Sequence, residues 1–257
     1  MSPGLRDRVY IVTGSSKGFG LAIARRLVEQ GARVGIISRN QEAVDEAVAQ
    51  IGIEYTHGAA CDVGSSEQVR EVFAKLKSHF GRLDGLVNNA GLATPNSVEN
   101  LVESEVVAQV QTNFLGTVFC CQAAISLLRD GDNPRIVNIS SASAWHDDEM
   151  SHLSIYASTK AAVERFSRDL RLELQHDQIG VTCVRPGGAM TNFSDGWDSD
   201  ALAGALEAWR DAGAYLDMGM EPEDVADAVC FALAQRAGVA VDLLEVRPNR
   251  LISKSIF

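Results

Sequence analysis

The chain has too little positive charge to bind polyanions. Its 34 aspartates and glutamates outnumber its 23 lysines and arginines, so the net charge is −11 at pH 7. Nucleic acids and anionic membranes attract proteins through a positive field, which this composition does not supply. We therefore expect no nucleic acid and no membrane among its partners, and small molecules as its ligands.

Long hydrophobic runs and a cysteine framework are also missing. No apolar run approaches the roughly 18 residues that span a membrane, and Arg6-Asp7-Arg8 before a short apolar run does not resemble a signal peptide. The five cysteines are odd in number, have no CxxC spacing and lie among apolar residues (Cys61, Cys120, Cys121, Cys183 and Cys230). We expect buried free thiols and a cytoplasmic location.

The chain does have the alternating pattern of an α/β protein. Its 257 residues, 46% of them hydrophobic, suit one buried core, and no repeat or linker divides them. The β-rich runs are Val9–Thr13, Val34–Ile37, Tyr55–Cys61, Gly85–Asn88, Ile136–Ile139, Val181–Val184 and Val241–Val246. Between them lie helical patterns at Phe19–Gln30, Gln41–Ile51, Ser66–Phe80, Val98–Arg129, Ser154–Gln175 and Glu223–Gln235. Regular alternation predicts a single α/β domain with a doubly wound parallel sheet.

A glycine-rich octapeptide, Thr13–Gly20, joins the first apolar run to the first helical stretch. Such a junction needs glycine because the backbone must turn tightly and let a pyrophosphate approach the N–H groups of the helix N-terminus. The order Ser-Lys-Gly argues against a nucleoside triphosphatase loop, which requires Gly-Lys-Ser/Thr. The turn alone is weak evidence, since glycines in such a turn are more often structural, and a dinucleotide site follows only together with a second motif.

Tyr156 and Lys160 form a second motif. A spacing of four residues on a helix places the phenol and the ammonium on one face. Alone, such a pair is more often an ordinary surface pair than a site. Together with the glycine turn, it indicates a nicotinamide-dependent oxidoreductase.

These motifs resemble the short-chain dehydrogenase/reductase family in its TGxxxGxG and YxxxK form. Further landmarks match in order over nearly the whole chain: Asp62-Val63, Asn88–Gly91, Asn113, the strand Arg135–Ser141, and Pro186-Gly187 followed by Thr191. The resemblance implies one domain over residues 1–257, with a Rossmann-like, doubly wound, seven-stranded parallel sheet and helices on both faces. It also implies hydride transfer between a nicotinamide and a carbonyl or secondary alcohol.

The end of the second strand selects the nicotinamide in this family. An acidic residue there would bind the ribose of NAD and repel a 2′-phosphate, but this chain has Ser38 followed by Arg39. Because Lys17 stands just before Gly18, two cations can converge on a 2′-phosphate, and we expect NADP(H). Two solvated surface cations are the alternative. The resemblance implies cofactor binding by Gly14, Ser16, Lys17, Gly18, Phe19, Gly20, Arg39, Asp62, Val63, Asn89, Ala90, Gly91, Tyr156, Lys160, Pro186, Gly187 and Thr191.

Tyr156 is predicted to be the proton donor. Hydride transfer to a carbonyl leaves charge on oxygen, so a donor must stand beside it. Lys160, together with the charge of the oxidised nicotinamide, is expected to favour the phenolate and to hold the nicotinamide ribose.

The resemblance supplies two more catalytic residues. Ser141 matches the hydroxyl that orients the substrate, although Ser140 and Ser143 compete because the interval to the tyrosine is longer than usual. Asn113 matches the position where the side chain and local backbone hold a water beside the lysine. The predicted catalytic set is Asn113, Ser141, Tyr156 and Lys160.

Residues 192–220 break the alternation, with aromatic residues and methionines among small and acidic ones. The family has a mobile substrate lid here, and we expect it to cover a largely apolar substrate. Packing of a lid helix by Trp209 is the alternative. The loop Trp145–His152 holds an acidic cluster that either selects a cationic or polar substrate or forms a solvated turn. His146 and His152 have no metal-like spacing, so we expect no metal.

The sequence thus predicts an NADPH-dependent carbonyl reductase or alcohol dehydrogenase, with substrate and direction open. One alternative is a 3-oxoacyl-carrier-protein reductase, which the overall acidity and the ending Val246–Arg250, in place of Asp-Gly-Gly, argue against. Another is a non-catalytic NADPH-sensing scaffold, which the full catalytic set argues against. The resemblance implies a homodimer or homotetramer through two long helices. The tail Leu251–Phe257 either joins that interface or folds back on its own subunit.

Overall fold

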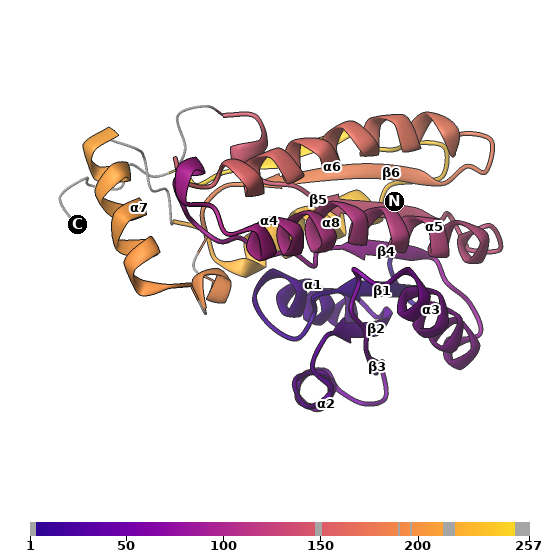
Figure 1. Ribbon diagram of the computed structural model, residues 1–257. Helices are drawn as coiled ribbons and strands as arrows, with labels where there is room; N and C mark the ends of the chain where they lie inside the picture. Colours follow the sequence, from indigo (N-terminus) through magenta and orange to yellow (C-terminus); the bar gives the residue numbers. More distant parts are fainter. Residues whose placement is uncertain (1–3, 147–150, 190, 196, 213–218, 250–257) are drawn as a thin grey trace.

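Seven parallel strands form one sheet in the order β3-β2-β1-β4-β5-β6-β7 (Figure 1). The computed structural model describes residues 4–146, 151–189, 191–195, 197–212 and 219–249. The strands are β1 Val9–Thr13, β2 Arg33–Ser38, β3 Thr56–Ala60, β4 Gly85–Asn88, β5 Arg135–Ile139, β6 Gly180–Pro186 and β7 Leu243–Val246. The chain builds outward from β1 to one edge, returns, and builds from β4 to the other. This doubly wound topology confirms the predicted fold class.

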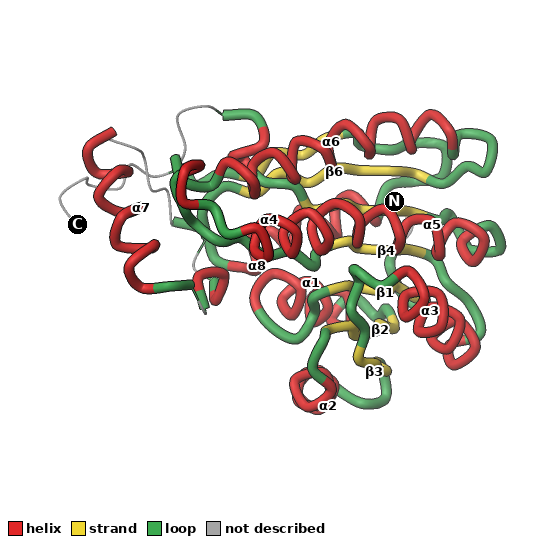
Figure 2. The backbone as a smooth tube through the Cα atoms, viewed as in Figure 1, coloured by secondary structure: helices red, strands yellow, loops and turns green. Residues whose placement is uncertain are grey.

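Helices cover both faces of this sheet (Figure 2). They are α1 Gly18–Glu29, α2 Gln41–Ile51, α3 Ser66–Phe80, α4 Glu103–Gln109, α5 Gly116–Leu128, α6 Ser154–Glu173, α7 Ser199–Ala212 and α8 Pro222–Leu233. A π-helical segment, η2 Val110–Leu115, joins α4 to α5, and the 3-10 turns are η1 Val98–Asn100, η3 Ala142–Ala144 and η4 Asn192–Ser194. Helices α1, α2 and α8 contribute to the core on one face, and α3, α5 and α6 to that on the other.

Alternate strand residues fill these two cores, because successive side chains of a strand point to opposite faces. In β1, Tyr10 and Val12 belong to the core with α1 and α8, whereas Val9 and Ile11 belong to the core with α3 and α5. All four are buried. A parallel sheet covered on both faces requires such continuous hydrophobic strands. All five cysteines are buried free thiols, as expected.

The helical stretch Glu103–Leu128 is long and apolar enough to cross a membrane by length and composition alone, with a mean hydropathy of 1.2. Its buried residues Cys120, Ala124 and Leu128 share a core with α3, α6 and the strands. Core packing therefore accounts for part of its apolar composition, since 33% of the apolar window is buried.

The first turn of this region departs from the prediction, which began one helix at Val98. Asn96 Nδ2 donates to the carbonyl oxygen of Asn100 at 2.8 Å, and Asn100 Nδ2 donates to Ser97 Oγ at 2.9 Å. Such side-chain hydrogen bonds compete with the helical pattern. They hold η1 as a separate turn, and the helix begins only at Glu103.

Helix α7 stands to one side of the layers, at the left of Figures 1 and 2. A lid helix packed by Trp209 was the alternative interpretation of this segment, and the signals that set its bounds are in the sequence. Asp198 Oδ1 accepts hydrogen bonds from the backbone N–H groups of Asp200 and Ala201 at 3.0 and 2.9 Å, which is a helix cap. Apolar residues then follow at helical spacing (Ala201, Leu202, Ala205, Leu206 and Trp209).

Candidate active site

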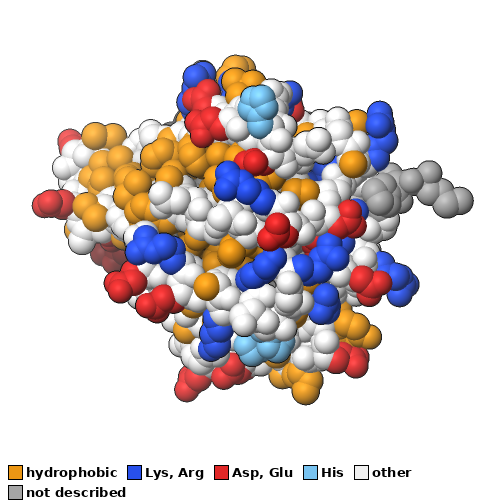
Figure 3. All heavy atoms as spheres, turned by 90° about the vertical axis from the view of Figure 1, so that its right-hand side faces the viewer, with side chains coloured by type: hydrophobic (Ala, Val, Ile, Leu, Met, Phe, Trp, Pro, Cys, Tyr) orange, Lys and Arg blue, Asp and Glu red, His pale blue; other side chains and the backbone are white. Residues whose placement is uncertain are grey.

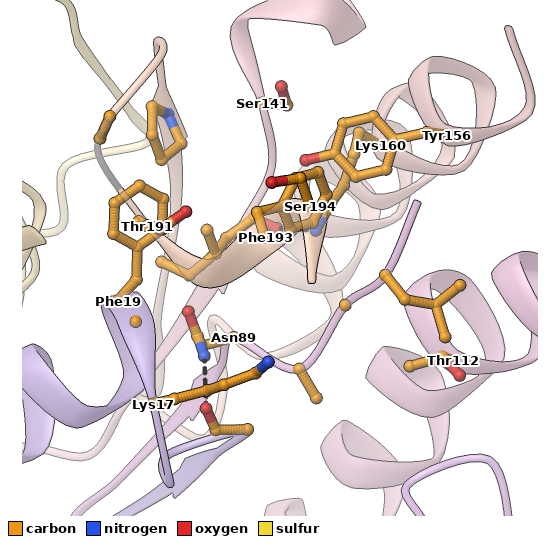
Figure 4. A pocket seen from close by; sticks show the side chains of 18 of the residues that line it. Lys17, Phe19, Asn89, Thr112, Ser141, Tyr156, Lys160, Thr191, Phe193 and Ser194 are labelled. Carbon is orange, nitrogen blue, oxygen red and sulfur yellow. Dashed lines mark hydrogen bonds between the residues drawn. The ribbon is translucent and has the colours of Figure 1, made fainter. Parts of the chain in front are cut away.

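A cavity of about 540 Å³ opens at the carboxyl ends of the strands. Residues that follow the strands line one side, and the lid lines the other (Figure 4). The strand order reverses between β1 and β4, and doubly wound sheets bind ligands at such a point. Every predicted cofactor-binding residue except Gly20 lines this cavity.

The glycine turn after β1 has a backbone that requires glycine. Gly14 and Gly18 have φ angles of +63° and +54°, in the left-handed region. A β-carbon at Gly14 would also lie only 2.9 Å from the Cα of Ala90. At Gly20 a β-carbon would collide with the carbonyl oxygen of Gly14, so this third glycine lets α1 pack closely against the turn. The N-terminus of α1 is thereby open to an anionic group.

Two cations stand in the cavity wall near this turn, as predicted. Lys17 N-caps α1 and Arg39 follows β2, and both line the cavity. Lys17 Nζ lies 3.1 Å from Oδ2 of Asp195, a lid residue. Arg39 makes no hydrogen bond or ion pair with any described residue. The charge of Lys17 is therefore already paired with a carboxylate, whereas that of Arg39 is not paired with any described residue.

Tyr156 and Lys160 lie at the opposite side of the cavity from Lys17 (Figure 4). Helix α6 places them one turn apart, with Lys160 Nζ 5.7 Å from the centroid of the Tyr156 ring. Nζ donates a hydrogen bond to the carbonyl oxygen of Ile139 at 2.9 Å. Phenol and ammonium thus share one face, as the spacing predicts.

Burial controls the ionisation of both groups. It lowers the pKa of Lys160 to about 8 and raises the pKa of Tyr156 to about 12. A hydrogen bond with Ser141 lowers the pKa of Tyr156, but by less than burial raises it. The protein's own groups therefore do not give the depressed phenol pKa that we expected from the motif.

Ser141 is the serine that the structure brings to Tyr156, as predicted. Ser143 orients it, because the Ser143 backbone N–H and hydroxyl reach Ser141 Oγ at 3.3 and 2.9 Å. The hydroxyl of Ser140 is engaged elsewhere and donates to Glu164 at 2.8 Å. The two competing serines therefore have supporting roles.

Asn113 lies behind the cavity wall and not in it. Its Oδ1 accepts from the backbone N–H of Leu92 at 2.8 Å, and its Nδ2 donates to the Leu92 carbonyl oxygen at 2.8 Å and to Thr159 Oγ1 at 3.0 Å. The π-helical segment η2 carries this fully buried side chain. Both amide hydrogens of Asn113 are therefore used by the protein, whereas Oδ1 accepts one of the two hydrogen bonds it can accept. The expected role of Asn113 in holding a water stays a prediction.

Aromatic lid residues cover Tyr156. The ring of Phe193 lies 5.3 Å from that of Tyr156 and 6.0 Å from that of Trp197, between centroids. The lid leaves the body at Ala189 and returns at Met220, and these two residues pair in a parallel bridge. The described lid residues that line the cavity are Thr191, Phe193, Ser194, Trp197, Leu202, Leu206 and Trp209. Tyr215 and Met218, which belong to the predicted lid, lie outside the described residues.

The two lid tryptophans use their indole N–H groups differently. Trp209 is buried, and its Nε1 donates to the carbonyl oxygen of Ser151 at 2.6 Å. This bond fastens α7 to the segment before α6. Trp197 Nε1 is buried without a hydrogen-bond partner among the described residues. Trp209 therefore serves both as cavity lining and as the packing residue of the alternative interpretation.

An ion-pair network that we did not predict, buried at Glu164 and Arg185 and partly exposed at Glu245 and His146, lies beside the site. Glu164, one turn beyond the lysine of α6, accepts hydrogen bonds from Arg185 at 2.8 and 2.6 Å as well as from Ser140. Arg185 also donates to Glu245 at 2.7 Å, and His146 Nε2 lies 2.7 Å from the same carboxylate. The network ties Ser140, the residue after β5, to α6, β6 and β7. Its members are too far apart in sequence to form a motif.

The remaining predictions concern the loop after η3. His146 joins the network above, and His152 Nδ1 lies 3.0 Å from Ser151 Oγ, so neither faces the cavity. The acidic cluster Asp147–Glu149 lies outside the described residues. Within the described ranges, no group of three His, Cys, Asp or Glu side chains could hold a metal ion.

Comparisons with known proteins agree with this geometry. The short chain dehydrogenase family matches residues 8–201. The human dehydrogenase/reductase SDR family member 11 is 30% identical over 265 residues, which cover 98% of this chain and 99% of that protein. The chain is thus similar to a curated protein over nearly the whole length of both.

Two solved structures are similar to the chain and contain nicotinamide cofactors. The closed form of a serine dehydrogenase complexed with NADP⁺ is 29% identical, with a TM-score of 0.82 over 93% of this chain and 94% of that one. A 3-ketoacyl-(acyl-carrier-protein) reductase from Brucella melitensis complexed with NADH is 26% identical, with a TM-score of 0.82 over 96% and 100%. These likenesses indicate a nicotinamide-binding protein, but they do not distinguish between NADP(H) and NAD(H) as its cofactor.

Proposed function

Because the chain belongs to the short-chain dehydrogenase/reductase family and is an oxidoreductase, we propose that it is an NADP(H)-dependent reductase of largely apolar carbonyl compounds. One observation carries the proposal. A single cavity joins two cations, Lys17 and Arg39, to the cluster of Ser141, Tyr156 and Lys160 beneath an aromatic lid. Oxidation of NADPH by the protein with a panel of carbonyl compounds tests it.

The cavity suits a phosphorylated dinucleotide. The glycine turn and the N-terminus of α1 favour a pyrophosphate, and the planar guanidinium of Arg39 offers several donors to a 2′-phosphate. When bound, the nicotinamide cofactor supplies or accepts the hydride. The residues Asp62, Val63, Asn89 and Ala90 form the wall between the two ends of the cavity.

Tyr156 delivers the proton. With a pKa of about 12 the phenol is protonated at neutral pH, so it can donate to the oxygen of the carbonyl. Ser141 shares a hydrogen bond with the phenol and offers a second donor to the same oxygen. The ammonium of Lys160 stabilises the phenolate that proton donation leaves behind.

Activity is expected to depend on pH through Lys160. Because burial lowers the pKa of this lysine to about 8, it is mostly protonated at neutral pH and loses its charge as the pH rises through 8. Loss of this charge removes the stabilisation of the phenolate, so kcat/KM for carbonyl reduction should fall above this pH, by up to about tenfold per pH unit. Steady-state rates of carbonyl reduction between about pH 6 and pH 10 measure this pH dependence of kcat/KM. A kcat/KM that stays flat across this range would contradict the assignment.

Lid substitutions are expected to alter substrate preference. Trp197→Ala and Trp209→Ala each remove a large apolar wall, which should change the kcat/KM ratio between bulky and small carbonyls by about tenfold or more. Trp209→Ala should also lower the free energy of unfolding by about 3–5 kcal/mol, since it empties a buried site.

The measurement is the ranking of substrates for each variant, with NADPH affinity as the control. Affinity should be unchanged because Trp197 packs on Phe193 and Trp209 is bonded to Ser151, and neither indole contacts Lys17 or Arg39. An unchanged ranking in both variants would defeat the idea of an apolar substrate.

We also propose that the protein is a homodimer or homotetramer. Val102, Val107 and Val110 near and on α4, and Leu172 on α6, are exposed large hydrophobic residues. Figure 3 shows hydrophobic side chains gathered along the flank that faces the viewer in Figure 1, where α5 and α6 lie. A second copy would cover such a surface. The tail Leu251–Phe257 lies outside the described residues, and the cytoplasmic location and the absence of nucleic-acid and membrane partners stay predictions.

The alternatives are not favoured. A carrier-protein substrate would need a basic docking surface on an acidic chain, and Arg129, one candidate for it, is already bound to Asp177 at 3.1–3.2 Å. A non-catalytic scaffold would have no use for the assembled Ser141, Tyr156 and Lys160.

A further inference from the structure

Asp195, a lid residue, forms an ion pair with Lys17, one of the two cations of the proposed 2′-phosphate site. Lys17 Nζ and Asp195 Oδ2 lie 3.1 Å apart, and their side chains are 60% and 54% exposed. Asp195 follows η4, whose residues Phe193 and Ser194 line the same cavity as Lys17. The pair therefore connects the glycine turn to the lid at the edge of the cavity.

This contact belongs to a wider approach of the lid to the turn. A β-carbon placed on Gly18 would meet Cβ of Thr191, which precedes η4, at 3.9 Å. The first residues of the lid thus lie against the cofactor loop, and Asp195 brings a negative charge to that place. Arg39, by comparison, has no such partner among the described residues.

We propose that Asp195 competes with the 2′-phosphate for Lys17 and so determines how strongly the protein prefers NADPH over NADH. The inference rests on the proposed function. A phosphate and a carboxylate repel one another, and a lysine ammonium is a point charge that both would seek. NADPH must therefore displace Asp195 or bind beside its charge, whereas NADH leaves the ion pair intact.

The expected change in NADPH affinity is small because the side chains of Lys17 and Asp195 are both exposed. Ion pairs between exposed side chains are weak, so removing the competing carboxylate should raise the affinity for NADPH by about two- to fivefold. The affinity for NADH should not change. Added salt should shrink the difference, because it screens exposed charges.

The test uses Asp195→Asn, which keeps the size of the side chain and removes its charge. The matched control is Asp200→Asn, which removes the same charge from an exposed position on α7 outside the cavity lining. Fluorescence titration gives the affinities for NADPH and NADH of both variants, of Lys17→Ala and of the double variant Lys17→Ala/Asp195→Asn. The expected result is tighter NADPH binding by Asp195→Asn and not by Asp200→Asn, with a smaller gain in the Lys17→Ala background.

The outcomes separate this inference from the proposed function. If Lys17→Ala and Arg39→Asp weaken NADPH binding but Asp195→Asn leaves it unchanged or weaker, the inference fails and the proposed cofactor stands. If Asp195→Asn improves NADPH and NADH equally, the effect is not at the 2′-phosphate and the inference also fails. If neither cation variant affects NADPH, the proposed cofactor choice itself is wrong.

Discussion

Replacing Tyr156 with phenylalanine is expected to lower the turnover of carbonyl substrates by about 10²–10⁴-fold, the usual contribution of general acid catalysis. The change keeps the ring that packs against Phe193 and leaves the hydrogen bond between Lys160 and Ile139 in place. It removes the only described group placed to deliver a proton to the substrate oxygen next to Ser141. Cofactor affinity should therefore stay near that of the wild type.

Two assays on the same variants separate these effects. Fluorescence reports NADPH binding, and absorbance reports the rate of reduction. Lys160→Ala is the comparison variant and should damage both, because the lysine is proposed to hold the ribose and to stabilise the phenolate. Near-normal catalysis by Tyr156→Phe would overturn the mechanism.

The second large effect is expected at the other end of the cavity. Arg39→Asp should weaken NADPH binding by about ten- to a hundredfold, since one charge-assisted hydrogen bond contributes roughly 1.5–3 kcal/mol. The guanidinium makes no hydrogen bond or ion pair with a described residue, so its charge is fully available to the 2′-phosphate. NADH, which carries no 2′-phosphate, should be affected far less.

Lys17→Ala provides the internal comparison for this prediction. Its effect on NADPH should be the smaller of the two, because Asp195 already neutralises part of its charge. Titration of both variants with both cofactors measures the difference. A wild-type preference for NADH, or an Arg39→Asp variant that keeps its NADPH affinity, would refute the assignment of these cations.

Much of the fold and the site could be predicted because the relevant signals are local. The glycine turn is one octapeptide, and the spacing of Tyr156 and Lys160 fits one helical turn. β1 and β4 have the predicted bounds, and the other strands differ by one to a few residues at their ends. Chain order then places these segments at the carboxyl edge of the sheet, because parallel strands all end there.

The features that were missed depend on contacts between distant segments. The hydrogen bonds of Asn113 to the Leu92 backbone, which set the orientation of its side chain, are one such contact. The pKa of Tyr156 follows from burial, which the YxxxK spacing does not report. The pairing of Glu164 with Arg185 depends on the register of α6 against β6, which only the folded chain fixes. Helix α7 is different, because a lid helix packed by Trp209 was one of the two interpretations, and its cap and apolar spacing were visible in the sequence.

The most direct test of the account is the oxidation of NADPH by the wild-type protein in the presence of a panel of ketones, diketones, quinones, sugars and steroids. We predict that bulky apolar carbonyls are reduced, that they outcompete small sugars, and that NADPH supports the reaction better than NADH. No turnover across the panel with either cofactor would contradict the account and favour a protein that binds the nucleotide without catalysis.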